Sequence, residues 1–460
     1  MDGFNKKCRV VRLGLVLLAV GPVVCSALAG DTLSWNTTQQ KVTADIKGSQ
    51  LLGVLERIAK ATHWQVFVEP ETFHTVSVKF KDVPPGEALR LLLGDVNFAL
   101  LPATNASPKL YVFRTARQNA TQLIAPRKAD HLIPNELIVR LKPGAKIDDL
   151  ARLLGAKVVG RIDSLNAYRL QFDDAAATAT AREQLAANPA VDSVDSNFLV
   201  DRPDPPQSMP GNPAQLQLQL KPPPDTGRII VGLIDTPVQP LGNDLDKFLL
   251  KQVSVAGDVQ VGGDAPTHGT AMAETILRSL EANTKGSTSV QILPVNVYPY
   301  ASSGDFSTTS FDVANGIIQA VNGGAKIINL SLGSPDDSDF LRSIVQQVSR
   351  LNIALIAAAG NEPVTTPFYP AAYPGVQAVT AIDQGQLAPY ASRGSFVSLA
   401  APGTSIVPFG NMAFGVEGTS VSSAFTSGLA AGYLELNGGT IGQMQNFLSR
   451  NFGIRIIPGK

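Results

Sequence analysis

Long apolar runs separated by helical patterns restrict the fold of residues 228–460 more than any other feature. The runs RIIVGLID, VQILPVNV, AKIINLSL, IALIAAAG and VQAVTAI are almost continuously apolar, which is typical of strands covered on both faces. Helical patterns lie between them, notably at residues 311–322 and 339–351. This alternation predicts an α/β domain built on a doubly wound, mostly parallel sheet.

Residues 131–200, here called the second module, have a different order of patterns. A strand at 136–141 precedes an amphipathic helix that Gly155 ends, and two further strands follow. An Ala-rich helix around residues 175–187 leads to a last strand that begins at Val191. The order β-α-β-β-α-β predicts a small α+β module.

Residues 31–115, here called the first module, contain a weak internal repeat. VTADIK at 42–47 is echoed by VSVKFK at 76–81, and each is followed by a helical pattern and a short strand. Two β-α-β halves are therefore expected. The pattern resembles the short N-terminal domain of secretins and TonB-dependent receptors, which implies docking to a protein partner of the cell envelope.

The segment between the second module and the α/β domain, residues 201–227, is rich in proline at both ends. It cannot form a continuous helix or a central strand. We expect a linker in which LQLQL at 216–220 could lie as an edge strand on the following domain.

The N-terminus has the features of a secretory signal peptide. Four basic residues precede the apolar run at 13–24, and Ala27-Leu28-Ala29 follows it. A helix over that run would reach about 18 Å, short of the roughly 30 Å hydrocarbon core of a bilayer. We expect cleavage after residue 29 and export to the periplasm or the medium, with an uncleaved membrane anchor as the alternative. Both cysteines, Cys8 and Cys25, lie in this segment.

The charge composition and the motifs exclude several classes of function. Lys and Arg number 38, as do Asp and Glu, which does not favour nucleic acid as a partner. The sequence contains no phosphate-binding loop and no redox motif, and we expect no cofactor. The acidic loop formed by Asp336, Asp337 and Asp339 could hold calcium, but a solvated turn explains it as well, because calcium needs six or more converging oxygens.

Two residues with ionisable side chains lie at the ends of elements predicted for the α/β domain. Asp235 ends an apolar strand, where a carboxylate is costly unless it has a partner. His268 opens a helix in THGTAMAET. Of the four histidines the other three precede residue 132, so a histidine base in the α/β domain has to be His268.

Two further motifs supply a hydroxyl and an amide. GTS at 418–420 begins a helix of small residues, so Ser420 lies where unpaired backbone N–H groups and the helix dipole favour negative charge. A capping serine is the ordinary alternative. AAAGNE at 357–362 places Asn361 at the end of another strand, and its amide could bind an oxyanion together with the Ser420 N–H.

Together and in this order, the motifs resemble the subtilisin-like serine proteases, the subtilase family. The matching motifs are LIDT at 233–236, HGT at 268–270, INLSLG at 328–333, AAAGNE at 357–362 and GTS at 418–420. The resemblance implies that Ser420 is the nucleophile, His268 the general base and Asp235 its orienting acid, with Asn361 in the oxyanion hole. Ser422 and Ser423 then pack the helix.

The same resemblance assigns residues to substrate binding. Ser331, Leu332 and Gly333 would pair with an extended substrate backbone. A wall of the first specificity pocket, which receives the side chain before the scissile bond, would come from Ala358, Ala359 and Gly360. Phe368 stands where many family members have a small residue at the base of that pocket, so we expect a shallow pocket that prefers small side chains.

The second module resembles a subtilase pro-segment, which implies an inhibitor that is part of the same chain. Self-cleavage is then expected between about Phe198 and the Pro-rich stretch. The leading interpretation is an exported serine endopeptidase made as a pro-enzyme. The alternative is a catalytically inert envelope protein that binds or senses a partner through the first module, and a protease delivered to a partner by that module would combine the two.

Overall fold

The protein was analysed as a computed structural model. The structure describes residues 32–70, 72–102, 107–124, 131–211, 213–221, 229–258, 262–299 and 307–454. The expected signal peptide, residues 1–29, lies outside the described residues. Among the helices of these ranges, none has the length and apolar character needed to cross a membrane.

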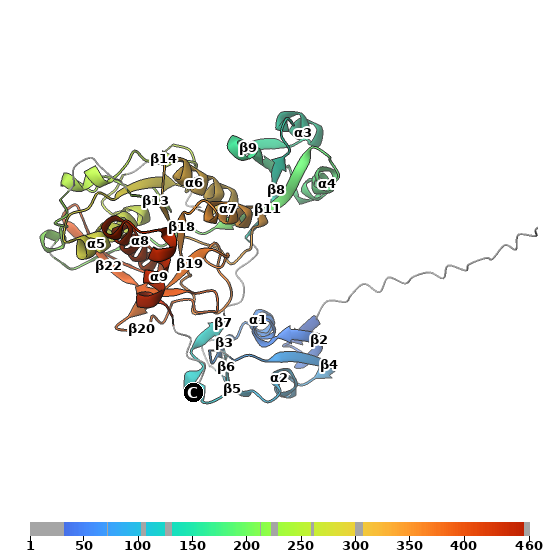
Figure 1. The fold of residues 1–460 in the computed structure, drawn as a ribbon. Helices are drawn as coiled ribbons and strands as arrows, with labels where there is room; N and C mark the ends of the chain where they lie inside the picture. The colour runs from blue at the N-terminus through green and yellow to red at the C-terminus, as the bar shows by residue number, and fades with distance from the viewer. Residues whose placement is uncertain are drawn as a thin grey trace, which may run out of the picture. The chain divides into compact units, whose positions relative to one another are not determined.

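The α/β domain contains the predicted sheet (Figure 1). Its strands are β13 (Ile230–Asp235), β14 (Val253–Ser254), β15 (Gln291–Asn296), β17 (Ile327–Leu330), β18 (Ala354–Ala358), β19 (Val376–Asp383), β20 (Gln386–Leu387) and β21 (Leu399–Pro402). They lie in the order β14-β15-β13-β17-β18-β19-β20, with β21 also paired to β19. All pairs are parallel except β19 with β20. The doubly wound α/β fold is therefore confirmed.

Helices cover both faces of this sheet (Figure 1). One core contains apolar residues of α5 (His268–Thr284), α8 (Thr419–Asn437) and α9 (Ile441–Phe452). The other contains those of α6 (Ser310–Asn322) and α7 (Asp339–Ser349). The sheet residues are buried on both sides, which explains why these strands lack an alternating pattern.

The second module has the predicted order of elements. They are β8 (Leu132–Leu141), α3 (Ile147–Leu154), β9 (Lys157–Ile162), β10 (Ala167–Gln171), α4 (Ala175–Ala186) and β11 (Val191–Val200). Helix α3 ends at Gly155, whose φ of 67° is left-handed, as the sequence predicted. The last strand, β11, pairs with β8. The last two residues of β11 also pair with β16 (Thr308–Thr309) of the α/β domain.

The chain divides into two compact units. One contains residues up to 54 together with 74–94, and the other contains residues 55–73 and those from 95 onward. In the first unit, β1 (Thr32–Asn36), β2 (Lys41–Gln50) and β4 (Thr75–Val83) form an antiparallel sheet, followed by α2 (Pro85–Leu93). In the second, β5 (Asn97–Leu101), β6 (Lys109–Phe113), β3 (Gln65–Val68) and β7 (Gln122–Ile124) form another. Helix α1 (Leu51–Thr62) spans the boundary. The elements expected for the first module are present.

Part of the Pro-rich segment is integrated into the α/β domain. β12 (Gln207–Met209) pairs with β23 (Met412–Glu417), which in turn pairs with β22 (Thr404–Phe409). Residues 213–216 form a 3₁₀ turn, so the edge strand expected for 216–220 is wrong. Leu218 and Leu220 lie in the core instead. Their burial explains why two leucines at alternate positions resembled a strand.

Candidate active site

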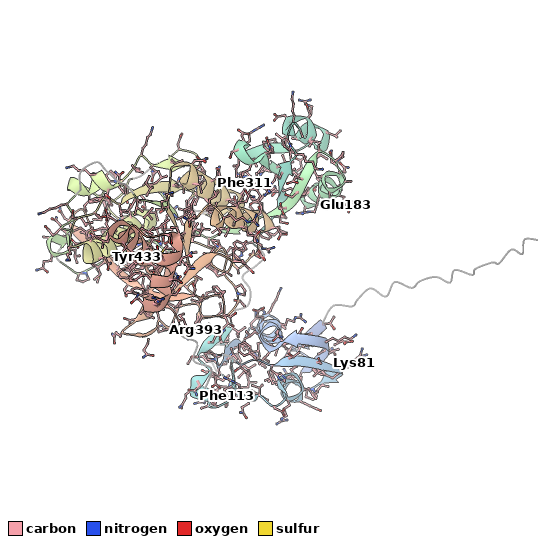
Figure 2. All side chains as sticks on the ribbon, in the orientation of Figure 1. Lys81, Phe113, Glu183, Phe311, Arg393 and Tyr433 are labelled. Carbon is pink, nitrogen blue, oxygen red and sulfur yellow. The ribbon has the colours of Figure 1, made fainter. Side chains whose placement is uncertain are left out.

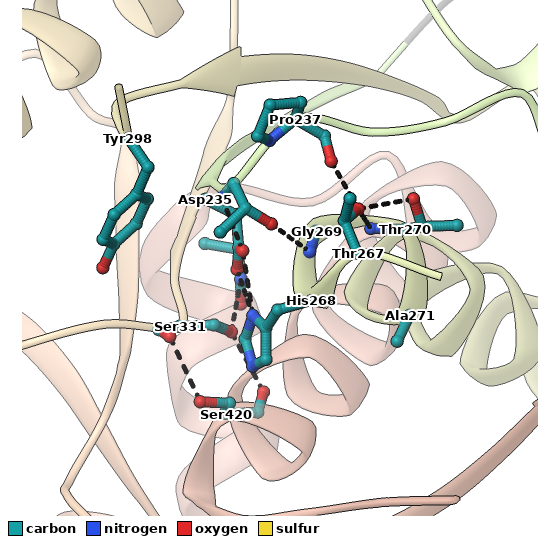
Figure 3. A network of polar contacts seen from close by, with 12 residues as sticks. Asp235, Pro237, Thr267, His268, Gly269, Thr270, Ala271, Tyr298, Ser331 and Ser420 are labelled. Atoms are coloured by element: carbon teal, nitrogen blue, oxygen red, sulfur yellow. Dashed lines mark hydrogen bonds and ion pairs between the residues drawn. The ribbon is translucent and has the colours of Figure 1, made fainter. Parts of the chain in front are cut away.

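Asp235 and His268 form a buried pair at the carboxyl end of the sheet (Figure 3). Asp235 is the last residue of the central strand β13, and His268 is the first residue of α5. The Nδ1 atom of His268 lies 2.8 and 2.9 Å from the two carboxylate oxygens of Asp235. An ionised carboxylate only accepts hydrogen bonds, so Nδ1 donates and Nε2 of the neutral ring is left as the proton acceptor.

Thr236 joins this carboxylate to the helix that carries the imidazole. Its backbone N–H donates to Asp235 Oδ1 at 2.7 Å, and its hydroxyl oxygen accepts the Gly269 N–H at 2.8 Å. A Cβ on Gly269 would lie 2.2 Å from the Thr236 carbonyl oxygen, so only glycine allows this approach. The sequence analysis missed Thr236, although a hydroxyl residue directly after the aspartate was a usable signal.

Ser420 is the second residue of α8 and is 7% exposed. Its hydroxyl donates to the carbonyl oxygen of Ser331 at 3.1 Å, and the Ser331 hydroxyl donates to the carbonyl oxygen of Ser420 at 3.0 Å. Figure 3 shows the ring of His268 between Asp235 and Ser420. Within the described residues, no hydrogen bond joins the Ser420 hydroxyl to His268, because this hydroxyl is bonded to the Ser331 carbonyl instead.

The other serines of GTSVSS are structural. Ser422 and Ser423 are completely buried. The Ser422 hydroxyl donates to the Ala401 carbonyl at 3.0 Å, and the Ser423 hydroxyl donates to Asn329 Oδ1 at 2.9 Å. These bonds tie α8 to the strands beneath it. A Cβ on Gly428 would lie 2.5 Å from the carbonyl oxygen of Ile276 in α5, which explains the small residues of α8.

The amide oxygen of Asn361 is engaged by Thr419, which leaves the amide nitrogen to donate to another group. The backbone N–H and the hydroxyl of Thr419 both donate to Asn361 Oδ1, at 2.8 and 3.0 Å. Because a backbone N–H can only donate, these bonds fix which end of the amide is oxygen. Asn361 is exposed, and its Nδ2 would lie 2.9 Å from a Cβ on Gly418. The orienting role of Thr419 was also missed by the sequence analysis.

The residues assigned to substrate binding follow two neighbouring strands. Ser331 to Gly333 come after β17, and Ala358 to Gly360 end β18 and follow it. Leu332, Ala358 and Ala359 are buried. Gly333 makes no backbone hydrogen bond to any residue that the structure describes. Phe368 is half-buried and contacts Gly333 and Gly360.

Tyr298 connects this site to the end of the second module. It lies beside Asp235 (Figure 3) and is almost completely buried. Burial, assisted by the Asp235 charge, raises the pKa of Tyr298 well above its ordinary value. The hydroxyl therefore stays protonated and donates to the Asp201 carbonyl at 3.0 Å.

The carboxylates of the acidic loop have partners within this chain. Asp336 accepts from Nδ1 of His131 at 2.8 Å, while Asp337 and Asp339 pair with Arg342. Over the described ranges, no group of three or more His, Cys, Asp or Glu side chains could hold a metal ion.

Comparisons with known proteins extend the similarity beyond these motifs. The sequence model described as "Subtilase family" matches residues 226–451, and the model described as "Fervidolysin N-terminal prodomain" matches residues 118–197. The second match covers most of the second module and begins before it, so the order of prodomain and peptidase domain is present in this chain.

Individual relatives are similar to this chain over a little less than half of its length. The chain is 34% identical over 211 residues to a thermophilic serine proteinase of Bacillus sp. (strain AK1), covering 44% of this chain and 51% of that protein. It is 32% identical over 212 residues to subtilisin DY of Bacillus licheniformis, covering 44% of this chain and 74% of that protein. The chain thus spans about half the length of the first relative.

A solved structure gives the same fold at lower sequence identity. The crystal structure of fervidolysin from Fervidobacterium pennivorans, a keratinolytic enzyme related to subtilisin, aligns with a TM-score of 0.55 at 19% identity. The alignment covers 70% of this chain and 57% of that one.

Proposed function

Since the chain belongs to the subtilase family, we propose that it is an exported serine endopeptidase made as a pro-enzyme. The observation that carries this proposal is the buried Asp235–His268 pair beside Ser420, at the N-terminus of α8. The imidazole has its Nδ1 proton held by the carboxylate, which leaves Nε2 free to act as a base.

Acylation would begin when the Ser420 hydroxyl leaves the Ser331 carbonyl and turns to His268 Nε2. Exchanging one hydrogen bond for another costs little, because a single bond of this kind contributes about 1 kcal/mol. The Ser420 oxygen then bonds to the peptide carbonyl carbon while its proton passes to Nε2. That proton goes on to the amine as the carbon–nitrogen bond breaks. Water repeats the steps on the acyl-enzyme and releases the acid.

The negative charge of the tetrahedral intermediate would be held by two N–H donors. One is the Asn361 amide, whose oxygen is engaged by Thr419. The other is the backbone N–H of Ser420, which at the start of α8 has no partner inside the helix. A substrate strand would pair with the free backbone edge at Gly333 and so bring its carbonyl to these donors.

The second module would inhibit the enzyme before activation. Its last strand, β11, pairs with β16 of the α/β domain. Directly after that strand, the Asp201 carbonyl accepts from Tyr298, which lies beside Asp235. The end of the module is thus joined through Tyr298 to the neighbourhood of Asp235.

A fluorophosphonate probe tests the proposal, because it reacts only with a serine activated in this way. We expect labelling of the full chain, none in Ser420→Ala, and a loss of at least about 1000-fold in rate in His268→Ala. Ser395→Ala removes an exposed serine and should label normally. Equal labelling of the chain and of Ser420→Ala would exclude a Ser420 nucleophile, and no labelling of the unmodified chain would favour an inert binding protein.

A further inference from the structure

The side chain that precedes the scissile bond has a defined place in this site. Ser331 contacts the nucleophile through its carbonyl oxygen, and Gly360 donates its N–H to the Thr419 hydroxyl at 3.0 Å. Asn361, the oxyanion donor, follows Gly360 directly. With the attacked carbonyl between Ser420 and Asn361, its side chain has to enter the space between the segments 331–333 and 358–360.

The ring of Phe368 occupies this space. A Cβ on Gly333 would lie 2.3 Å from Phe368 Cε1, and a Cβ on Gly360 would lie 3.2 Å from Phe368 Cγ. One aromatic ring therefore contacts both segments where each of them is glycine. The backbone next to it is fixed, because Ser334 and Tyr369 exchange two hydrogen bonds of 2.8 Å.

We infer that Phe368 closes this pocket to all but Gly, Ala and Ser, and that the chain therefore does not cut itself within residues 198–206, here called the junction. The inference rests on the proposed peptidase function. A larger side chain would have to displace an aromatic ring whose backbone is held in place, which costs far more than the burial of a few methylene groups returns.

The junction, residues 198–206, fits such a pocket poorly. Its sequence FLVDRPDPP contains no Gly, Ala or Ser, and three of its nine residues are proline. The nearest small residues are Ser196 and Ser208. Ser196 lies in β11 and pairs with Leu137, and Ser208 lies in β12 and pairs with Phe414, so neither can reach Ser420 without breaking a sheet.

Both ends of the junction are also held. Val200 pairs with Thr308, and Gln207 pairs with Gly415 in the strand that leads to Ser420. The self-cleavage expected between about Phe198 and the Pro-rich stretch is therefore not expected within these residues. A cut there requires a peptidase that accepts large, acidic or basic side chains.

The pocket is tested with two peptidyl phosphonates that differ only in the residue at the reactive end, Ala or Phe. The measured quantity is the ratio of their labelling rates on the full chain, because a docked inhibitory module slows both reactions equally. We expect the Ala probe to react at least about 100-fold faster. Phe368→Gly should move the ratio by a similar factor towards the Phe probe, whereas Phe73→Gly, at a residue 81% exposed, should leave it unchanged.

Two outcomes would overturn the pocket assignment: a preference of the unmodified chain for the Phe probe, or an unchanged ratio in Phe368→Gly. Should Phe368→Gly fold poorly, Phe368→Ala gives the same readout with a smaller change of backbone freedom. Failure of the peptidase function itself looks different, because then neither phosphonate nor the fluorophosphonate labels any variant.

The junction is tested by intact mass and N-terminal mapping of the full chain after prolonged incubation. We expect residues 198–206 to stay uncut in the unmodified chain. A new N-terminus between residues 199 and 207 that forms at the same rate at every dilution and is lost in Ser420→Ala would refute the inference. Added trypsin or chymotrypsin should cut the junction and raise the labelling rate of the fluorophosphonate.

Discussion

The candidate active site and the contact between the second module and the α/β domain are held together by different forces. In the active site, hydroxyl and backbone groups of Thr236, Ser331 and Thr419 fix three side chains, two of them buried and one exposed, and every partner belongs to the α/β domain. The module contact combines an ion pair, Arg169 with Asp312 at 2.9 Å, with an apolar core in which Ile138 and Ile162 of the module belong to the same buried cluster as Phe311 of α6. The active site is thus fixed by hydrogen bonds within one domain, whereas the module contact joins two parts of the chain through an ion pair and the burial of apolar side chains.

The helix N-termini show the same difference. The first turn of α5 is capped within the α/β domain by Thr267, which accepts the Thr270 N–H. At the N-terminus of α6, the second module supplies an additional acceptor. Asn197 Oδ1 accepts from the Ser310 hydroxyl and the Phe311 N–H, at 3.0 and 3.2 Å. The ring of Phe311 also faces this module (Figure 2), since a Cβ on Gly160 would lie 2.8 Å from it. Dissociation of the module leaves α6 intact but less well capped.

The largest effect is expected from the aspartate of the active site. Asp235→Asn keeps the shape but can donate to His268 Nδ1, which favours the wrong tautomer of the ring. We expect kcat to fall about 10⁴-fold with the fold unchanged. Asp383→Asn is the matched control, because Asp383 is an exposed aspartate at the end of β19 in the same sheet. A loss below tenfold in Asp235→Asn would show that the pair does not orient the base.

Removal of the oxyanion donor should have the next largest effect. Asn361→Ala is expected to lower kcat about 100- to 1000-fold with KM nearly unchanged, because the amide would act only on the developing charge. Thr419→Val removes the hydroxyl bond to Asn361 and leaves the backbone bond, so we expect a loss of about tenfold. If Asn361→Ala raised KM and left kcat unchanged, the amide would bind substrate rather than the intermediate.

The positions of Asp235, His268, Asn361 and Ser420 could be predicted because each follows a strand or opens a helix. Parallel strands bring such positions to one edge of the sheet, and their identity limits their chemistry. The bond between Ser420 and the Ser331 carbonyl could not be predicted, since it depends on a side-chain rotamer. The same holds for Asn361, whose sequence position does not reveal which end of the amide is held.

Packing between distant segments is the second feature that could not be predicted from the sequence. LQLQL alternates as a strand does, but Leu218 and Leu220 enter the core from an irregular segment. Nothing near residue 216 in the sequence indicates that Arg278 of α5 donates to the Leu216 carbonyl at 2.5 Å. Local periodicity reports which side chains are buried, while the partner that buries them is set by the tertiary fold.

On the side of the module contact, Arg169→Ala should weaken inhibition without harming the site. Arg169 and Asp312 are both mostly buried, and a charged hydrogen bond in such a place contributes about 1.5–3 kcal/mol. We therefore expect the fluorophosphonate to label the full chain roughly 10-fold faster. Arg152→Ala, at an arginine that is 79% exposed and pairs within the module, should change nothing. A rate unaffected by Arg169→Ala would show that this pair does not control access to Ser420.

A carboxyl group of α5 should affect the stability of the fold rather than a reaction rate. Glu274 of α5 is buried and pairs with Arg278 at 2.8 Å, and Arg278 holds Leu216 of the segment that follows the second module. Burial, opposed in part by Arg278, raises the pKa of Glu274 from 4.5 to about 7. The folded chain thus holds this proton more tightly than the unfolded chain does, so the group stabilises the fold below about pH 4.5 and loses this contribution as the pH rises through about 7.

The shift corresponds to about 3 kcal/mol in the free energy of unfolding between those two pH values. Urea unfolding in the Ser420→Ala background, which prevents autolysis, measures it. Glu274→Gln should flatten the decline with pH, whereas Glu281→Gln, a few residues along the same helix, should keep it. A decline that persists unchanged in Glu274→Gln would mean that another group titrates.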